Sequence, residues 1–270
     1  MRRAAQVLYL LGVVLPLAAG TAVALRYSVG EFSSGGFTLH HFSSLWDVRF
    51  LRSIGFTAAI AVVATLAALW TALGVVRLVG AVEAVPGWLL IPLAWPPVVV
   101  AFVVFHVFSG SGLLSRVFHA VGWVDDPGEF ISLVNDRWGI GIAVAHYALT
   151  FPALVLFLLY LRSRPTMDDL DRVAQSLGAL PRERWRSVLR PVIVRQALPL
   201  VLVYAIFTLG SYEVAKLLGA QRIQAVVPFL SDRISGYNLA DIPAGYALAL
   251  GYTVLIAVAM AFISKRFGHG

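Results

Sequence analysis

TMDDLDRVAQSLGALPRERWRSVLRP, residues 166 to 191, is a polar, arginine-rich segment set between two long apolar runs of the chain. The flanking runs are Gly139 to Leu161 and Ala197 to Leu218. Each has the length of about 20 residues that a helix needs to cross about 30 Å of hydrocarbon at about 1.5 Å per residue. The segment therefore predicts a helical hairpin that leaves the membrane between two spans.

The first half of this hairpin has the pattern of a short amphipathic helix. Thr166 begins a T-x-x-D pattern with Asp169, which is a signature of a helix N-terminus. Leu170, Val173, Ala174 and Leu177 follow at i, i+3, i+4 and i+7, which places them on one apolar stripe. Gly178 comes next, where a left-handed helix cap favours a residue without Cβ.

The second half predicts another short helix. Pro181 suits the first turn of a helix, because its missing N–H has no partner to lose there. Trp185, Val188 and Leu189 form an apolar stripe of their own. Pro191 is expected to interrupt the backbone hydrogen bonds before the next apolar run begins.

The composition of the whole chain is that of an integral membrane protein. Its 270 residues are 59% hydrophobic and 13% charged, with a mean hydropathy of +0.83. Lipid offers backbone groups no partners outside a single helix, and the runs lack the alternation of a membrane β-barrel. We expect an all-α polytopic fold with six transmembrane helices, forming one transmembrane domain over residues 1 to 270. The six runs are Ala4 to Leu25, Ile54 to Val76, Val85 to Phe108, Gly139 to Leu161, Ala197 to Leu218 and Ala244 to Ser264.

The first run is also compatible with a signal peptide, because Arg2 and Arg3 precede it and Ala22-Val23-Ala24 lies near its end. Its length of about 22 residues exceeds the usual 7 to 15 of a signal core, which favours a retained helix. The chain contains no cysteine, so neither a disulfide nor a thiolate metal site is available.

The distribution of basic residues predicts the orientation. With six spans, both termini, the 77 to 84 loop and the 162 to 196 loop share one side, and that side carries 13 of the 21 Lys and Arg residues. Its net charge is +8, against −1 on the other side. Because basic residues near span ends stay in the cytoplasm, both termini and the hairpin are predicted to be cytoplasmic. The basic pI thus reflects topology, and no nucleic-acid site is indicated.

The hairpin resembles the EAA loop of six-helix permeases from binding-protein-dependent ABC importers. The family pattern is E-A-A-x-x-x-G, nine residues, then I-x-L-P. With the glycine at Gly178, the E-A-A positions hold Arg172, Val173 and Ala174, and the final pair holds Arg190 and Pro191. Arg172, Val173 and Arg190 depart from the pattern, and Asp171 supplies an acid one position early.

Further similarity to the family extends from about Phe50 to the C-terminus. The stretches that carry it are FLRSIGFTAAIAVVATLAALWTALG, IPLAWPPVVVAF, VNDRWGIGIAVAHYALTFPAL and LGSYEVAKLLG. LGSYEVAKLLG and the loop before the fourth run look most like the polyamine (spermidine/putrescine) branch. The branches for iron, thiamine, phosphonate and sugar come behind it.

The resemblance implies a coupling helix that docks into a groove of a cytoplasmic ATPase subunit. The chain has no G-x-x-x-x-G-K-[ST] stretch, so a partner is expected to bind ATP and no cofactor of its own is expected. The further implied partners are a second permease subunit, in a heterodimer, and an extracytoplasmic solute-binding protein, with lipid around the spans. The implied location is the prokaryotic plasma (inner) membrane. The coupling residues would be Asp171, Arg172, Val173, Ala174, Leu177, Gly178, Trp185, Val188 and Pro191.

Polar residues at membrane depth are candidates for a solute path, because such residues tend to face a cavity or a partner. Glu213 favours a cationic solute, but Lys216 one turn later opposes this and also permits a simple i,i+3 pair. Tyr204, Thr208 and Ser211 recur at near-helical spacing in the fifth run. His146, with Tyr147 and Thr150, and His106 are alternatively explained by helix–helix hydrogen bonds.

Other classes of function fit the sequence less well. An enzyme is not expected, because neither H-E-x-x-H nor G-x-S-x-G occurs and no pair of carboxylates lies at membrane depth. An ion-coupled secondary transporter would carry ionisable relays in several spans, whereas only the fifth run contains an acid. A purely structural subunit, with a hairpin that packs only against its own spans, is the remaining alternative.

Overall fold

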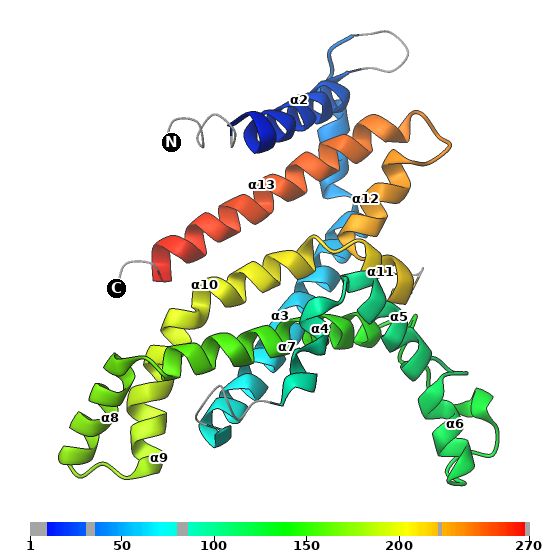
Figure 1. Cartoon of the computed structure of the whole chain (residues 1–270). Helices are drawn as coiled ribbons and strands as arrows, with labels where there is room; N and C mark the ends of the chain where they lie inside the picture. The colour runs from blue at the N-terminus through cyan, green and yellow to red at the C-terminus, as the bar shows by residue number, and fades with distance from the viewer. Residues whose placement is uncertain (1–9, 31–35, 80–85, 221–222, 268–270) are drawn as a thin grey trace. The chain divides into compact units, whose positions relative to one another are not determined.

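The computed structural model describes residues 10–30, 36–79, 86–220 and 223–267 (Figure 1). Within these ranges the regular structure is helical, apart from an isolated bridge between Gly30 and Phe37. Six helical segments there are long and apolar enough to cross a membrane. The predicted all-α, multi-pass membrane fold is confirmed. The spans are Leu10–Val29, Val48–Val79, Pro97–Ala120, Ile140–Arg162, Pro181–Leu209 and Asp241–Ile263.

The helices follow one another with short breaks. The first predicted run begins at Ala4, outside the described residues, and its described part is helical from Leu10. The elements are η1 (Leu10–Val14), α2 (Leu15–Val29), η2 (His40–Trp46), α3 (Val48–Val79), η4 (Gly87–Leu90), α4 (Ile91–Ala94), α5 (Pro97–Phe108), α6 (Leu113–Ala120), η5 (Pro127–Glu129), α7 (Ile140–Arg162), α8 (Pro165–Ser176), α9 (Pro181–Glu183), η6 (Arg184–Leu189), α10 (Arg190–Leu209), α11 (Glu213–Leu218), α12 (Val226–Ile234) and α13 (Asp241–Phe267).

The chain packs as two compact units. The terminal unit comprises residues 1–53 and 228–263, and the central unit comprises residues 54–227 and 264–270. In the terminal unit, Arg233 donates to the Asp47 carboxylate at 2.7 Å, and Tyr27 stacks on Tyr246 with ring centroids 5.2 Å apart. The first contact joins α12 to the residue before α3, and the second joins α2 to α13.

The central unit holds two hydrophobic clusters along α3 and α7. The cluster at the hairpin end unites α3, α7, α8, η6 and α10, so the hairpin packs onto the same core as the spans. The other cluster unites α3, α5, α7 and α11. Leu154, Leu158, Leu159 and Ile193 are fully buried in the first, and Ala101, Ala145, Val214 and Leu218 are at most 5% exposed in the second.

The third span differs from the predicted run of Val85 to Phe108. Helical structure breaks at Trp95 and Pro96, whose ψ angles of 135° and 147° are extended. The physical reason is that Pro96 and Pro97 each push the preceding residue out of the helical region. The span instead begins at Pro97 and continues through a bend into α6.

The fifth span is longer at its start and shorter at its end than the predicted Ala197 to Leu218. Helix runs from Pro181 without interruption to Leu209, so Pro191 does not separate the hairpin from the span as predicted. The π-helical turn η6 ends at Leu189, and Pro191 lies in the first turn of α10, where a residue that lacks an N–H is tolerated. Helix α10 ends at Gly210, and α11 begins only at Glu213.

Candidate functional site

Helices α8 and α9 form a hairpin that projects from the paired ends of α7 and α10 (Figure 1). Helix α8 starts after Arg164, with Pro165 at its first position. The predicted cap at Thr166 is wrong, because Thr166 already lies inside the first turn and no side chain caps this end. Pro165 explains the shift, since proline has a helix-compatible φ and needs no hydrogen-bond partner at that position.

The turn at Gly178 confirms the predicted left-handed cap. Gly178 has φ of +81°, its N–H donates to the Gln175 carbonyl at 2.9 Å, and the Ala179 N–H donates to the Ala174 carbonyl at 3.1 Å. These two bonds form the Schellman arrangement that satisfies the last carbonyls of a helix. On the far side, the Glu183 carboxylate accepts from the Leu180 N–H at 2.9 Å and fixes the start of α9.

The apolar stripe predicted on α8 divides between two faces. Ala174 is 7% exposed, and Met167, one turn before the predicted stripe, is 1% exposed in the core. By contrast, Val173 is 57%, Leu177 81% and Leu180 64% exposed. We call these three residues the apolar tip. Large apolar side chains gathered on a turn with no cover of their own are typical of a docking surface.

The base of the hairpin is held by ion pairs that meet at Asp171. The Asp171 carboxylate lies 3.7 Å from Arg162, at the end of α7, and 3.4 Å from Arg184, at the start of η6. Arg162 also donates to Asp168 at 2.9 Å. The side chains of Asp171, Arg162 and Arg184 are at most 25% exposed, whereas that of Asp168 is 52% exposed. Asp171 therefore ties both arms of the hairpin to the end of the fourth span.

The second predicted stripe faces the protein's own core. Leu189 is buried in the cluster at the hairpin end, Trp185 packs against that cluster, and Val188 is half-buried. Pro191 is exposed on the opposite side of the helix. Of the predicted coupling residues, Val173, Leu177 and Gly178 thus lie at the turn, whereas Ala174, Trp185 and Val188 pack inward.

The two arginines that depart from the EAA pattern lie in different surroundings. Arg172 is exposed on α8 and pairs at 3.7 Å with Asp169, which is also exposed. Arg190 is exposed on the opposite arm, where it lines a pocket with Arg77, Trp70 and Trp185. Arg172 therefore lies outside the network of ion pairs that Asp171 makes with Arg162 and Arg184 at the base.

Three of the polar candidates in and beside the spans are buried without hydrogen-bond partners among the described residues. His146 is fully buried and lies edge-on to Phe207 of α10, with ring centroids 5.9 Å apart, and neither ring nitrogen has a hydrogen-bond partner among the described residues. Thr150, one turn along α7, and Ser211, just after α10, also have buried, unpartnered hydroxyls. Buried polar atoms without partners are rare and point to a ligand or water.

The other polar candidates are accounted for or lie outside this cluster. The Thr208 hydroxyl donates to the Tyr204 carbonyl at 3.0 Å within α10. Because α10 ends before Ser211, the three residues do not share one continuous helical face as predicted. Glu213 is exposed at the first turn of α11.

The alternative prediction, that these polar side chains make hydrogen bonds between helices, is correct for Tyr147. Tyr147 of α7 donates to the Thr71 hydroxyl of α3 at 3.2 Å. His106 bonds instead to the carbonyl of Phe102 in its own helix, at 2.8 Å. His146 has no such bond within the described part of the chain.

Sequence reasoning did not find the two arginines that hold Asp171. Arg162 and Arg184 were counted only as charges of the basic loop, although their positions at the two ends of the hairpin were a signal that they lie close together. In the described ranges no group of three or more His, Cys, Asp or Glu residues has the arrangement of a metal site.

No protein-family model matches the chain. It is similar to the thiamine transport system permease protein ThiP of Brucella suis biovar 1 (strain 1330), with 31% identity over 191 residues, which is 68% of this chain and 32% of the relative. ThiP of Brucella abortus (strain 2308) matches to the same extent. The chain thus spans about a third of the length of the curated relatives it matches. These relatives are named as transport permeases and not as enzymes.

Proposed function

We propose, from this similarity to transport permeases, that the chain is the membrane-spanning permease of an ATP-driven ABC importer. The observation that carries the proposal is the hairpin, which ends in an apolar tip of three exposed large side chains and is anchored at its base. The six spans and the similarity to a named permease support the same function. The tip would fill a groove of a cytoplasmic ATPase subunit.

The geometry of the base explains how docking at the tip would act on the spans. The hairpin is continuous with α10, and Asp171 ties it to Arg162 at the end of α7. A force on the tip therefore reaches the fourth and fifth spans together. His146 of α7 packs against Phe207 near the end of α10, so a shift between these two helices would change the surroundings of this buried, unpartnered side chain.

The partners and location follow from the same proposal. An ATPase subunit binds the hairpin, a second permease unit completes the path, and an extracytoplasmic binding protein delivers the solute. The excess of basic residues on the hairpin side supports cytoplasmic termini in a prokaryotic inner membrane.

For the solute we favour thiamine over a polyamine. The named relatives are thiamine permeases, and the predicted polyamine branch finds no support in the comparisons. The buried polar residues of the described chain are serines, threonines and His146, without a carboxylate. A polycation would need several acids along its path, whereas thiamine carries one positive charge beside hydrogen-bonding groups.

The test is uptake into vesicles that contain the chain with its ATPase and binding protein. We expect uptake of labelled thiamine that requires ATP and the binding protein, and much weaker uptake of spermidine. Uptake that follows a pH gradient and ignores ATP would contradict the proposed class. Strong ATP-dependent uptake of spermidine would contradict only the choice of solute.

A further inference from the structure

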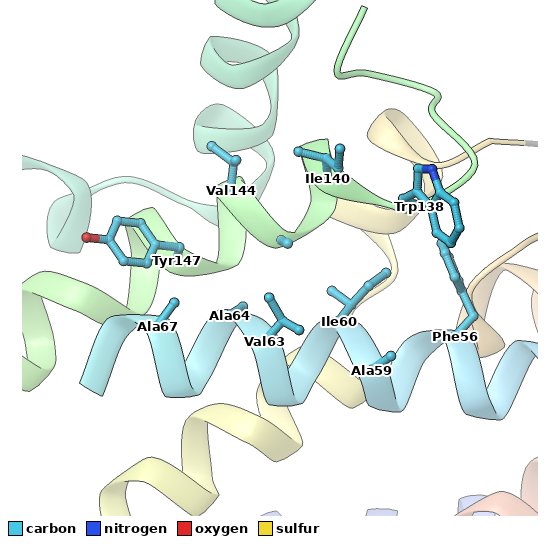
Figure 2. A pocket seen from close by; sticks show the side chains of 11 residues that line it. Phe56, Ala59, Ile60, Val63, Ala64, Ala67, Trp138, Ile140, Val144 and Tyr147 are labelled. Carbon is cyan, nitrogen blue, oxygen red and sulfur yellow. The ribbon is translucent and has the colours of Figure 1, made fainter. Parts of the chain in front are cut away.

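The half of α7 that lies away from the hairpin, residues 140–150, differs in chemistry between two of its sides. One side faces α3 across a cavity of about 560 Å³, which Val144 and Tyr147 line (Figure 2). Most side chains around this cavity are apolar, so a solute recognised by hydrogen bonds would find few partners in it. Another side carries His146 and Thr150, which are both fully buried. Polar partners for a solute are thus found on this second side.

His146 and Thr150 share one side of α7, because residues four apart in a helix are neighbours on its surface. His146 lies edge-on to Phe207 of α10, with ring centroids 5.9 Å apart. Neither ring nitrogen of His146 has a hydrogen-bond partner among the described residues, and the same is true of the Thr150 hydroxyl. Three polar atoms on adjacent turns of α7 are therefore buried without partners in the described part of the chain.

Thr150 differs from three other threonines of the spans. Thr65 and Thr71 of α3 and Thr208 of α10 each donate their hydroxyl to the carbonyl four residues earlier in the same helix. A threonine inside a helix commonly satisfies its hydroxyl in this way. The Thr150 hydroxyl makes no such bond within the described ranges. It is therefore available to a group outside its own helix.

The two side chains lie deep in the span. His146 is six residues and Thr150 ten residues from the start of α7 at Ile140, which is about 9 Å and about 15 Å along the helix. The hydrocarbon is about 30 Å thick, so Thr150 is near its middle. Unpaired polar atoms are unfavourable at this depth, and polar residues there tend to face a cavity or a partner. Their burial is explained if the helices part in another state and a polar ligand then contacts them.

Both helices at this contact contain a proline between the contact and the hairpin. Pro152 lies inside α7, two residues after Thr150, and Pro199 lies inside α10, eight residues before Phe207. A proline inside a helix removes a backbone hydrogen bond and tends to bend the helix. The parts of α7 and α10 that carry the contact are therefore able to tilt while the parts nearer the hairpin stay packed in their shared hydrophobic cluster.

We propose that α7 and α10 separate at the contact between His146 and Phe207, and that His146 and Thr150 then bind the solute by hydrogen bonds. This inference rests on the proposed function, whose solute path it places between the fourth and fifth spans. A neutral histidine ring offers one donor and one acceptor, and a threonine hydroxyl offers both. The Phe207 ring beside them favours an aromatic solute. Since the buried polar residues of the described chain include no acid, the fitting solute is a small aromatic molecule of low charge.

Cysteine accessibility tests the separation of the helices, because the chain has no cysteine of its own. Thr150→Cys is assembled with the ATPase and the binding protein and treated with a small, water-soluble thiol reagent, with and without ATP and vanadate. We expect labelling in one of the two nucleotide conditions, and slower labelling when thiamine is present. Ala145→Cys, equally buried but in the apolar cluster with α5 and α11, should stay unlabelled in both. Equal labelling of the two variants, whether absent or fast, would overturn the proposal.

Transport kinetics test the contact with the solute. Thr150→Val removes the hydroxyl and keeps the shape of the side chain, and it should raise the KM for ATP-dependent thiamine uptake about tenfold, the effect of one lost hydrogen bond. The maximal rate and the thermal unfolding midpoint should stay unchanged, since the hydroxyl has no partner among the described residues. Thr65→Val is the matched control with a normal KM, because the Thr65 hydroxyl bonds within its own helix.

A purely structural role gives different results. If Thr150 only held a buried water, Thr150→Val would lower the unfolding midpoint and leave the KM unchanged, which would overturn the inference. His146→Asn keeps a donor and an acceptor and should raise the KM less than His146→Leu, whereas equal KM values in these two variants would contradict hydrogen bonding by His146. Failure of the unchanged complex to take up thiamine with ATP would contradict the proposed function itself. Intact uptake with a normal KM in Thr150→Val would contradict only this inference.

Discussion

The base and the tip of the hairpin belong to one short segment, but the base is buried against the rest of the chain and the tip is exposed. At the base, Met167 is 1% exposed and Asp171 pairs with Arg162 and Arg184. At the tip, Leu177 is 81% and Leu180 64% exposed, and no other part of the described chain covers them. The same helix α8 supplies residues to both regions.

This difference indicates a division of roles. A loop that served only to join two spans would bury its apolar residues against its own bundle, as Met167 and Ala174 are buried. Leucines kept in water at a rigid turn are explained if a partner covers them. The fixed base then transmits to α7 and α10 whatever displacement the partner imposes on the tip.

The largest effect is expected from charging the tip. The variant Val173→Asp with Leu177→Asp should lower ATP-dependent uptake by about a hundredfold or more, because each change places a carboxylate in an apolar docking contact, where central residues contribute about 2 kcal/mol or more. The unfolding midpoint should stay nearly constant, since both positions are exposed. Uptake and thermal unfolding of the same preparation provide the check.

The control for the tip is Thr166→Asp, an exposed position at the base end of the same helix, which should keep near-normal uptake. Normal uptake in the double tip variant would mean that Val173 and Leu177 have no coupling role. The tip would then not be a docking surface, and the difference in exposure between tip and base would have no functional role.

The second largest effect is expected at the base, and on stability rather than docking. Asp171→Asn leaves Arg162 and Arg184 without their shared charge, and we expect a loss of about 1 to 2 kcal/mol, between the values for surface and buried ion pairs. Thermal unfolding in detergent measures it. Asp169→Asn, which breaks only an exposed pair, is the matched control and should change stability little. Equal losses in the two variants would show that the base is not an anchor.

A smaller effect is expected at the turn between base and tip. Gly178→Ala should destabilise the hairpin by about 1 kcal/mol, because φ of +81° is unfavourable for a residue with Cβ. An added Cβ would meet no atom within 4 Å, so the cost is one of backbone conformation alone. Gly178→Asn should restore part of the loss, since asparagine tolerates this region. Limited proteolysis at the turn measures both, and an asparagine variant as labile as the alanine one would refute this explanation.

The smallest effect is expected from Arg172→Gln. Its ion pair with Asp169 is exposed on both sides and contributes at most about 1 kcal/mol, so stability should hardly change. If Arg172 lies at the rim of the ATPase contact, uptake should fall a few-fold and more at low salt. A loss as large as that of the tip variant would move the centre of docking from the leucines to this arginine.

The sequence was sufficient for the number of spans and for the chemistry of the turn. Length and hydropathy define a helix in lipid almost alone, and Gly178 requires no tertiary information to be identified as a left-handed cap. The effect of Pro191 was predicted less well, because this proline is accommodated in a continuous helix shortly after a π-helical turn, which no local sequence pattern indicates.

The division of the hairpin into base and tip also needed the structure. Leu170, Val173, Ala174 and Leu177 lie on one stripe by periodicity, but the direction in which α8 crosses the core decides which of them is covered. The meeting of Asp171 with Arg162 and Arg184 depends on the fold of both arms. Ser211 also needed the structure, because α10 ends before it and the face predicted with Tyr204 and Thr208 is not continuous.

Single-cysteine cross-linking tests the central claim most directly, because the chain contains no cysteine of its own. Leu177→Cys and the control Thr166→Cys are each treated in native membranes with a short thiol-to-amine cross-linker, and the products are identified by mass spectrometry. We predict that Leu177→Cys joins an ATP-binding subunit and does so differently with and without ATP, while Thr166→Cys gives little product. Labelling of Leu177→Cys in intact cells by a membrane-impermeant thiol reagent would place the tip outside the cytoplasm and contradict the account.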